Sequence, residues 1–281
     1  MKIIKLRVVL TCFTALLAIS GAQTQVSLSP TSVFINDNTN IESLNISNRG
    51  DGQVEVNVRF EFSYPGYDDH GNMISITNDS LAAQRYSLTD NLRVFPRSFV
   101  IQPRGQQVVR LQVRPMREKP EGMYWARIIV SSNAPAADIE TVTAAEGVGT
   151  RVNFVFNQNI PVYYSKGNVI TGLDIINVKA YQEIDQLVSI VRLKPTGNSP
   201  YNGSVTAMIR DNNGQVVAEH QTINVVYFEA LRRVAIPFPD KGLPPGNYSL
   251  ELMFETRRRD ISPSKLVQAQ PVSYIIPVQL K

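Results

Sequence analysis

The chain of 281 residues contains one cysteine, two histidines and one tryptophan. The cysteine, Cys12, lies within the first 22 residues, so a chain that loses this segment contains no cysteine. Disulfides, thiol catalysis and thiolate metal sites are thereby excluded from the remaining 259 residues (281 − 22). We expect stability to come from the burial of apolar side chains, which two domains of this size supply.

Residues suited to catalysis are few and scattered. His70 and His220 fall in different predicted domains, both in turn-like surroundings, and no nucleophile elbow, P-loop, dinucleotide fingerprint or zinc-protease motif is present. The adjacent carboxylates of Asp68 and Asp69 are typical of a solvated loop. The sequence therefore predicts no enzyme, no catalytic residues, no cofactor and no metal site. A hydrolase would need a pocket that joins one of the histidines to carboxylates.

The positive charge is concentrated at the start of the chain. The formal net charge is +4, and Lys2, Lys5 and Arg7 contribute three of these charges, which leaves about +1 on the rest. The run Arg257-Arg258-Arg259 before Asp260 is typical of a solvated hairpin tip rather than of a phosphate-binding patch. We expect no nucleic-acid partner.

The first 22 residues have the layout of a secretory signal peptide. The basic start is followed by an apolar run from Val8 to Ile19 and then by the small residues Ser20-Gly21-Ala22. The apolar run is too short to span a bilayer comfortably, and Cys12 lies inside it rather than after a small residue. We expect cleavage after Ala22, export to the periplasm, and no membrane insertion of the mature chain.

Apolar and polar residues alternate through most of the sequence, with the two-residue period of a half-buried strand. Clear runs are Val54–Phe62, Val109–Val113 and Ile128–Val130, and Gly, Pro, Asn and Asp punctuate them. Short strands separated by such turns are typical of sandwiches and barrels. The sequence predicts an all-β chain made of two immunoglobulin-like β-sandwich domains in tandem.

A domain boundary is predicted near Ser165-Lys166-Gly167-Asn168. Residues 23–165 then form an N-terminal domain and residues 166–281 a C-terminal domain, each of ordinary size for one sandwich. The polar segment 63–91 exceeds a minimal sandwich and is expected to form a long hairpin or loop. Within it, residues 79–91 are the best candidate for a helix.

The tripeptide Arg49-Gly50-Asp51 has the spelling of an integrin-binding motif. Its position between two predicted strands favours a turn, because glycine and aspartate are the residues that such a turn needs.

The segment from Arg151 to Tyr164 predicts a long strand with one apolar face. Six of its seven even-numbered positions are apolar, and its odd-numbered positions are mostly asparagine, with Pro161 among them. Because proline donates no ladder hydrogen bond, we expect this strand at a sheet edge, or its pairing to end there. Two interpretations stay open. The apolar face fills the core of its own domain, or it is offered to a foreign strand that adds to the edge.

Three stretches resemble periplasmic pilus-assembly chaperones of the chaperone–usher (PapD-like) type. They are Val26–Ile35 leading to Leu44–Asn48, Val94–Val113 followed by Glu121–Ile128, and Ile160–Tyr164. The resemblance covers most of residues 26–165, and over the second domain it rests on order and size. It implies two immunoglobulin-like domains, the first of which lends its long edge strand to an incomplete pilin-like subunit until an outer-membrane usher takes it. The implied donor residues are Val152, Phe154, Phe156 and Ile160.

The chain departs from this family at the cleft. The family commonly has a basic pair there that binds the terminal carboxylate of the subunit, and the matching positions are Ser32 and Pro161. Neither residue makes a charged hydrogen bond. Arg97, Arg127, Arg151 and Lys166 are the candidates to replace the pair.

Two alternatives to a chaperone remain, a structural or adhesive two-sandwich surface protein that donates no strand, and a hydrolase. The accessibility of the strand that carries Val152 separates the first alternative from a chaperone.

Overall fold

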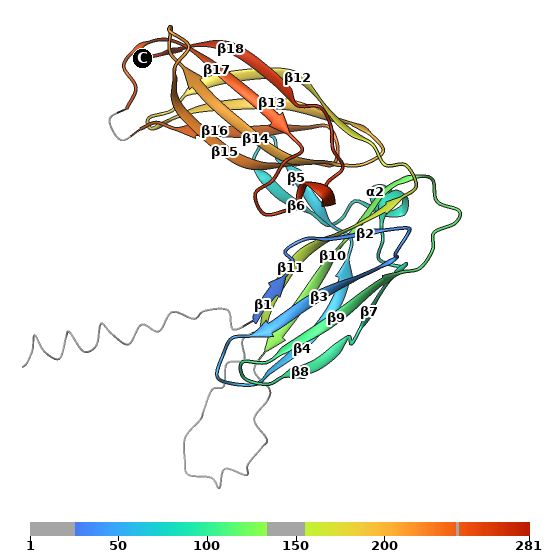
Figure 1. The fold of residues 1–281 in the computed structure, drawn as a ribbon. Helices are drawn as coiled ribbons and strands as arrows, with labels where there is room; N and C mark the ends of the chain where they lie inside the picture. Colours follow the sequence, from blue (N-terminus) through green and yellow to red (C-terminus); the bar gives the residue numbers. More distant parts are fainter. Residues whose placement is uncertain (1–25, 134–154, 240–241) are drawn as a thin grey trace, which may run out of the picture.

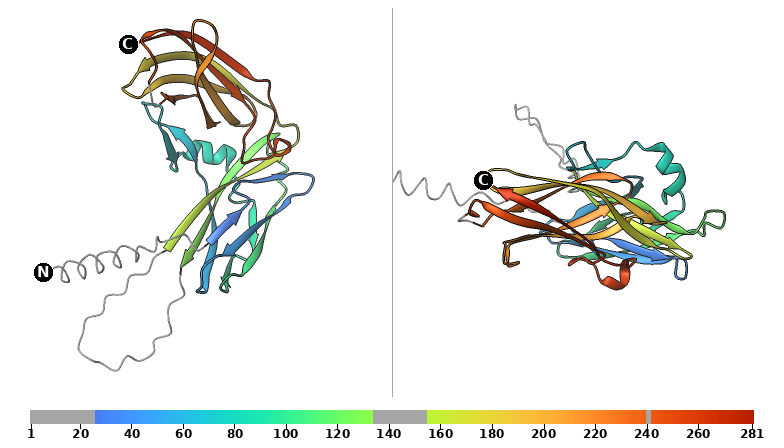
Figure 2. Two further views of the ribbon diagram at one scale, coloured as in Figure 1. Left: turned by 60° about the vertical axis from the view of Figure 1, so that its left-hand side comes forward. Right: turned by 90° about the horizontal axis from the view of Figure 1, so that it is seen from above.

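The computed structural model describes residues 26–133, 155–239 and 242–281 (Figure 1). It consists almost entirely of strands, arranged as two β-sandwiches that follow one another along the chain and meet at an angle (Figure 2). The predicted all-β fold with two immunoglobulin-like sandwiches in tandem is confirmed. The predicted signal peptide, with Cys12, lies outside the described residues. Within the described residues, no helix is long and apolar enough to cross a membrane.

The first sandwich consists of a four-stranded and a five-stranded sheet. The four-stranded sheet has, in spatial order, β1 (Val26–Ser29), β3 (Ile41–Asn48), β9 (Gln106–Val113) and β7 (Leu92–Phe95). The five-stranded sheet has β2 (Val33–Asn36), β11 (Val155–Lys166), β10 (Gly122–Asn133), β4 (Val54–Glu61) and β8 (Ser98–Ile101). β1 thus pairs with β3 in the first sheet. After residues 30–32 the chain crosses to the other sheet, where β2 pairs with β11.

The alternation in the sequence places one face of each strand in the core. Val54, Val56 and Val58 of β4 are at most 2% exposed, and the residues between them are exposed. Alternate residues of β9 and β10 are buried in the same cluster. This pattern follows from the pleat of a strand, which points successive side chains to opposite faces.

The second sandwich has a separate apolar core. One sheet contains β12 (Thr171–Gln182), β13 (Gln186–Gly197) and β16 (Ala230–Pro237). The other contains β15 (Val216–Val226), β14 (Tyr201–Arg210), β17 (Gly246–Glu255) and β18 (Val272–Leu280). The short 3-10 helix η1 (Pro263–Lys265) lies between β17 and β18.

The segment 63–91 forms a hairpin followed by a short helix. The hairpin consists of β5 (Tyr64–Tyr67) and β6 (Met73–Ile76), which make a two-stranded sheet of their own, and the helix is α2 (Ser80–Tyr86). Asp79 caps this helix, because its Oδ1 accepts the backbone N–H of Ala82 at 2.9 Å. Figure 1 shows the hairpin between the two sandwiches.

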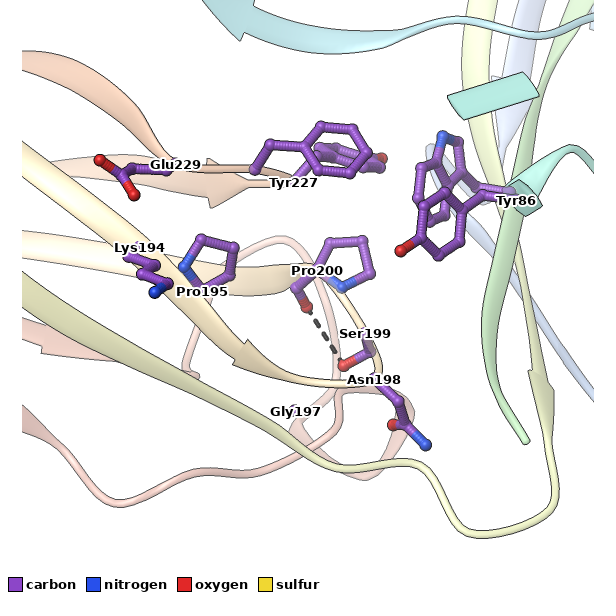
Figure 3. A pocket seen from close by; sticks show the side chains of 11 residues that line it. Tyr86, Lys194, Pro195, Gly197, Asn198, Ser199, Pro200, Tyr227 and Glu229 are labelled. Carbon is purple, nitrogen blue, oxygen red and sulfur yellow. Dashed lines mark hydrogen bonds between the residues drawn. The ribbon is translucent and has the colours of Figure 1, made fainter. Parts of the chain in front are cut away.

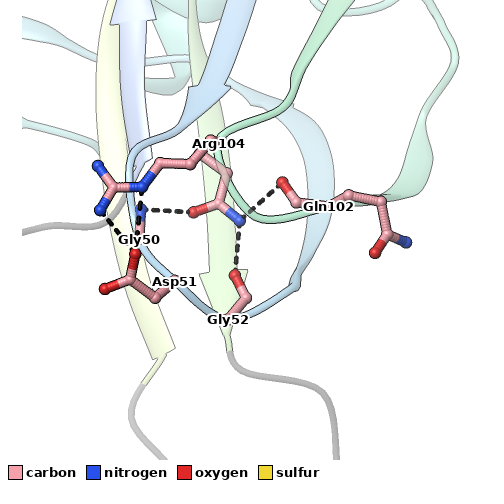
Figure 4. Close-up of polar contacts among 6 residues, drawn as sticks. Gly50, Asp51, Gly52, Gln102 and Arg104 are labelled. Carbon is pink, nitrogen blue, oxygen red and sulfur yellow. Dashed lines mark hydrogen bonds and ion pairs between the residues drawn. The ribbon is translucent and has the colours of Figure 1, made fainter.

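The Arg49-Gly50-Asp51 segment is a turn tied to its neighbours (Figure 4). The Asn48 side chain, 2% exposed, donates to the carbonyl oxygens of Gly52, Ile101 and Gln102 at 2.7, 3.2 and 3.1 Å. Its Oδ1 accepts the N–H of Gly50 at 2.9 Å. The Asp51 carboxylate accepts a 2.6 Å hydrogen bond from Arg104. The tripeptide therefore serves the structure of this turn, as expected.

Candidate strand-binding edge

Strand β11 is paired along its whole length on one side and along a third of it on the other. β10 pairs with it antiparallel from Val155 to Lys166, whereas β2 pairs with it in parallel only from Val162 to Ser165. Residues 155–161 therefore have no strand on their second side within the described part of the chain. This half-strand is called the free edge below. Among the residues that the structure describes, its outward N–H and C=O groups have no ladder partner, which is the condition for pairing with an added strand.

The apolar face of β11 is divided between burial and exposure. Ile160, Val162 and Tyr164 are 7%, 0% and 2% exposed and belong to the core of the first sandwich. Phe156, on the same face, is 42% exposed, and the neighbouring Val155 is 58% exposed. Ile160, which was also expected to contact a guest, is packed in the core of its own sandwich, and its part in guest binding stays a prediction. Val152 and Phe154 lie outside the described residues.

Hydrogen bonds of its polar side chains hold the free edge in place. Gln158 Nε2 donates to the carbonyl oxygen of Val26 in β1 at 2.7 Å, which ties β11 to the opposite sheet. On the other face, the Ser131 hydroxyl donates to Asn157 Oδ1 at 2.6 Å and receives a 2.8 Å bond from Arg59. The asparagine-rich positions of β11 thus lie on its polar, outward face, as the alternation predicts.

Ser32 and Pro161 lie where the free edge ends. The first pair of the parallel ladder is Val33 with Val162. Ser32 and Pro161 are the residues that directly precede this pair on β2 and on β11. Ser32 is 8% exposed. Across the antiparallel ladder, Arg127 of β10 is opposite both Pro161 and, on its other side, Glu61 of β4. These positions form one row across the sheet, which we call the cleft row.

Arg127 is the cation of the cleft row. Its side chain is partly buried and makes no hydrogen bond or ion pair with the described residues, and the nearby carboxylate of Glu61 is paired with Arg59 at 3.1 Å. Its odd position in β10 places it beside Trp125, on the face turned toward the second sandwich, whereas Tyr124, Ala126 and Ile128 enter the core. A partly desolvated guanidinium without a partner is suited to bind an anionic group.

Two tyrosines from different sandwiches meet next to this arginine. The Tyr227 hydroxyl donates to the Tyr163 hydroxyl at 2.9 Å, and both side chains are buried. Burial raises the pKa of Tyr227 well above its ordinary value and Tyr163 adds to this, while the positive charges of Arg127 and Arg258 oppose it. Tyr227 therefore stays neutral, and the positive charge of Arg127 acts on its hydroxyl. No pattern in the sequence signals this contact across the domain boundary.

The other basic candidates for the cleft are placed differently. Lys166 Nζ donates to the carbonyl oxygens of Arg117 and Lys119, so its charge is engaged at the far end of β11. Arg97 lies between β7 and β8 and lines a cavity with Phe60, Glu61 and Arg93, at the β4 end of the cleft row and across the sheet from the free edge. Arg151 lies outside the described residues. Among the candidates that the structure describes, only Arg127 belongs to the cleft row.

A cavity of about 210 Å³ lies at the domain junction (Figure 3). Tyr86, Trp125, Pro195, Pro200, Tyr227 and Phe228 form most of its wall. These rings belong to a cluster in which Tyr86 stacks on Trp125 with centroids 4.7 Å apart, and Trp125 meets Tyr227 edge-on at 4.8 Å. These rings join the two sandwiches by packing, and the polar residues Lys194, Asn198, Ser199 and Glu229 complete the wall of the cavity.

The two histidines are in separate parts of the molecule. His70 lies at the tip of the β5–β6 hairpin, and His220 lies in β15 opposite Ala207. Both side chains are exposed. Within the described residues, no group of three or more potential metal ligands comes together.

No protein-family model matches the chain, and no curated protein matches it. Solved structures that match it over about 90% of its length include pilus chaperones of the chaperone–usher type. The YadV chaperone is 10% identical, with a TM-score of 0.45, over 92% of this chain and 100% of that one. A chain of the SafA pilin–SafB chaperone complex of Salmonella enterica is 13% identical (TM-score 0.42, 92% and 99% covered). A chain of the CsuC–CsuE chaperone–tip adhesion subunit complex of Acinetobacter baumannii is 12% identical (TM-score 0.46, 89% and 98% covered).

Proposed function

We propose that this protein is a periplasmic chaperone that holds an incomplete, pilin-like subunit by pairing a strand of that subunit with the free edge of β11. The observation that carries the proposal is the uneven pairing of β11: on the side where β2 pairs, residues 155–161 have no neighbouring strand among the described residues. The class of guest follows from the sequence resemblance of residues 26–165. An outer-membrane usher that receives the guest belongs to the same proposal.

The free edge supplies two kinds of interaction. Its backbone groups pair with any extended segment, and this gives affinity without reading sequence. Phe156, at 42% exposure, then enters a gap in the guest, and the burial of such a ring contributes about 1.5–3 kcal/mol. We include Val152 and Phe154 in the proposed donor set, because they continue the same side of the strand in the sequence. Ile160 instead holds the strand to its own sandwich.

The cleft row supplies the end of the site. A guest strand on the free edge must stop near Ser32 and Pro161, because β2 occupies the next positions. Its terminal carboxylate then lies near the row on which Arg127 has no partner within the described residues. Arg127 therefore takes the anchoring role that Ser32 and Pro161 are chemically unable to perform.

A structural or adhesive surface protein with the same two sandwiches is the alternative. An exposed apolar ring at a sheet edge does not by itself separate the two functions, because Phe95 at the end of the short edge strand β7 is 77% exposed. The free edge of β11 differs, because it is longer than the whole of β7 and continues a strand that β2 covers only in part. This combination of open backbone and exposed ring favours the chaperone. In a structural module, the edge would be closed by its own chain.

The test is affinity capture from periplasm with the full chain as bait. We expect a pilin-like subunit to co-purify with the wild type and to be lost with Phe154→Asp plus Phe156→Asp. The matched control is Phe95→Asp, which places the same charge on an exposed phenylalanine of another strand and should keep the subunit. Unfolding of the double variant would favour burial of this face in its own core. Capture that is equal for all three proteins would overturn the proposal.

A further inference from the structure

We propose that the β5–β6 hairpin is a brace that holds the second sandwich at a fixed angle to the first. This inference concerns the domain arrangement and stands whether or not the chain binds a guest. The hairpin pairs with no other strand of the described chain, so neither sandwich needs it to complete a sheet. It nevertheless lies between the two sandwiches, as Figures 1 and 2 show.

The tip of the hairpin contacts the second sandwich through its backbone. The N–H of Arg233 in β16 donates to the carbonyl oxygen of Gly71 at 2.8 Å. Gly71 has a φ of +78°, and a Cβ placed on it would lie 2.5 Å from the nitrogen of Arg233. Only a residue without a side chain allows this approach.

The stem of the hairpin makes two further contacts with the same sandwich. The Tyr67 hydroxyl donates to the carbonyl oxygen of Val225 in β15 at 2.9 Å. The guanidinium of Arg232 lies over the Tyr67 ring, 5.3 Å from its centroid. A single short hairpin thus contacts two strands, β15 and β16.

The base of the hairpin is fixed to the first sandwich and to the junction. The Tyr64 hydroxyl donates to Asp79 Oδ2 at 2.5 Å, which joins the start of β5 to the N-cap of α2. The Tyr64 ring packs edge-on against Trp125 of β10 and against Phe228 of the second sandwich, with centroids 6.3 and 5.2 Å apart. The brace is therefore anchored at both ends, which opposes the relative motion expected of two linked domains.

Away from the hairpin, an ion pair also links the two sandwiches. Lys265 of η1 donates to Glu42 of β3 at 2.8 Å, and both side chains are exposed enough to exchange with water. This pair is weak, as exposed ion pairs are. The hairpin, with its backbone and ring contacts, is a stronger restraint than this pair, and it adds to direct contacts between the sandwiches such as the Tyr227–Tyr163 hydrogen bond.

The chain contains a matched control for the glycine at the tip. Asp68–Asn72 and Asp211–Gln215 form the same turn, in which the aspartate carboxylate accepts two backbone N–H groups and the glycine N–H bonds to the aspartate carbonyl. Gly214 has a φ of +80°, and no atom lies within 4 Å of the position that a Cβ would take there. Alanine costs the same backbone strain at both glycines, and only at Gly71 does it also separate the two sandwiches.

The experiment measures the distance between spin labels on the two sandwiches of the full chain. Arg110→Cys and Lys179→Cys place the labels on exposed positions, and Cys12→Ser removes the native thiol. We expect Gly71→Ala to broaden or shift the distance distribution and Gly214→Ala to leave it as in the parent. Should Gly71→Ala fail to fold, Tyr67→Phe replaces it, with the same broadening expected. An unchanged distribution in the brace variant, or equal changes at both glycines, would overturn the proposal.

Discussion

Phe156 and Ile160 lie four residues apart on the same side of β11, and only one of them is in the core. Ile160 is 7% exposed, whereas Phe156 is 42% exposed. The change occurs where β2 begins to pair with β11, at Val162. Around Phe156, β11 has only β10 as a neighbour within the described chain, and the Phe156 side chain is partly exposed to solvent. Near Val162, where β2 also pairs with β11, the side chains of this face are buried in the sandwich.

This division predicts opposite effects of truncation on stability. Ile160→Ala should lower the free energy of unfolding by about 2–5 kcal/mol, because it removes core contacts and leaves a cavity. Phe156→Ala should lower it by only about 1–2 kcal/mol, because 42% of the residue is exposed and its truncation leaves no enclosed cavity. Chemical denaturation of both variants checks this. Equal, large losses would show that Phe156 is a core residue and would remove it from the donor set.

Arg127 should matter for a guest that ends in a free carboxylate. Once a guest is captured, its terminal strand is prepared as two peptides, one with a carboxylate end and one with a carboxamide end. A charge-assisted hydrogen bond contributes about 1.5–3 kcal/mol to binding. Arg127→Gln should therefore lower the affinity for the carboxylate peptide by roughly tenfold to hundredfold. Binding of the carboxamide peptide should barely change.

The control for this arginine is Arg110→Gln, which removes an equally charged side chain from the exposed face of β9. Titration calorimetry measures all combinations. If Arg127→Gln lowered the affinity for both peptides equally, Arg127 would support the structure of the cleft without binding the terminal carboxylate.

The contact between Glu42 and Lys265 should depend on acid. The hydrogen bond from Lys265 is the main cause that lowers the pKa of Glu42 below its ordinary value of 4.5. A carboxyl whose pKa falls on folding stabilises the folded state above its unfolded pKa, and this contribution disappears as the pH falls through the folded pKa. Wild type should therefore exceed Lys265→Met in stability by up to about 1 kcal/mol near neutral pH.

The difference should vanish on acidification to below the folded pKa of Glu42. Thermal unfolding of both proteins across this range measures it. A gap that persisted in acid would mean that Lys265 acts through packing rather than through the carboxylate.

The turn at Arg49-Gly50-Asp51 depends on the residue before it. Asn48→Ala leaves three carbonyl oxygens and one N–H without their partner, so it should cost about 1–3 kcal/mol. Asp51→Ala removes only an exposed ion pair with Arg104 and should cost at most about 1 kcal/mol. Denaturation midpoints of the two variants decide this, and the reverse order would refute the structural role of Asn48.

The alternation of residues was sufficient to predict strands and their buried faces. Val54, Val56 and Val58 were expected on one face and are buried together. The pattern was insufficient to predict the partners of a strand, because pairing joins residues such as Val33 and Val162 that are far apart in the sequence. The burial of Ile160 depends on that pairing, so the apolar run alone predicted one uniform face where the structure has two parts.

Segment 63–91 shows a second limit. Its turn residues indicated a hairpin, and the hairpin is present. Its helix has only seven residues and one buried side chain, so it left almost no periodic signal. The contacts of Gly71 with Arg233 and of Tyr67 with Val225 depend on the placement of the second sandwich, which local patterns do not encode.

The short strand β2 would determine the register in which a guest strand pairs with β11. Because β2 already occupies the positions beside Val162–Ser165, an incoming strand meets a physical stop at Pro161. A shift of the register by one residue would turn every side chain of the guest strand to the opposite face of the sheet. In the proposed function, this stop would set the register by geometry alone, so guest strands of differing sequence would all be aligned in the same way.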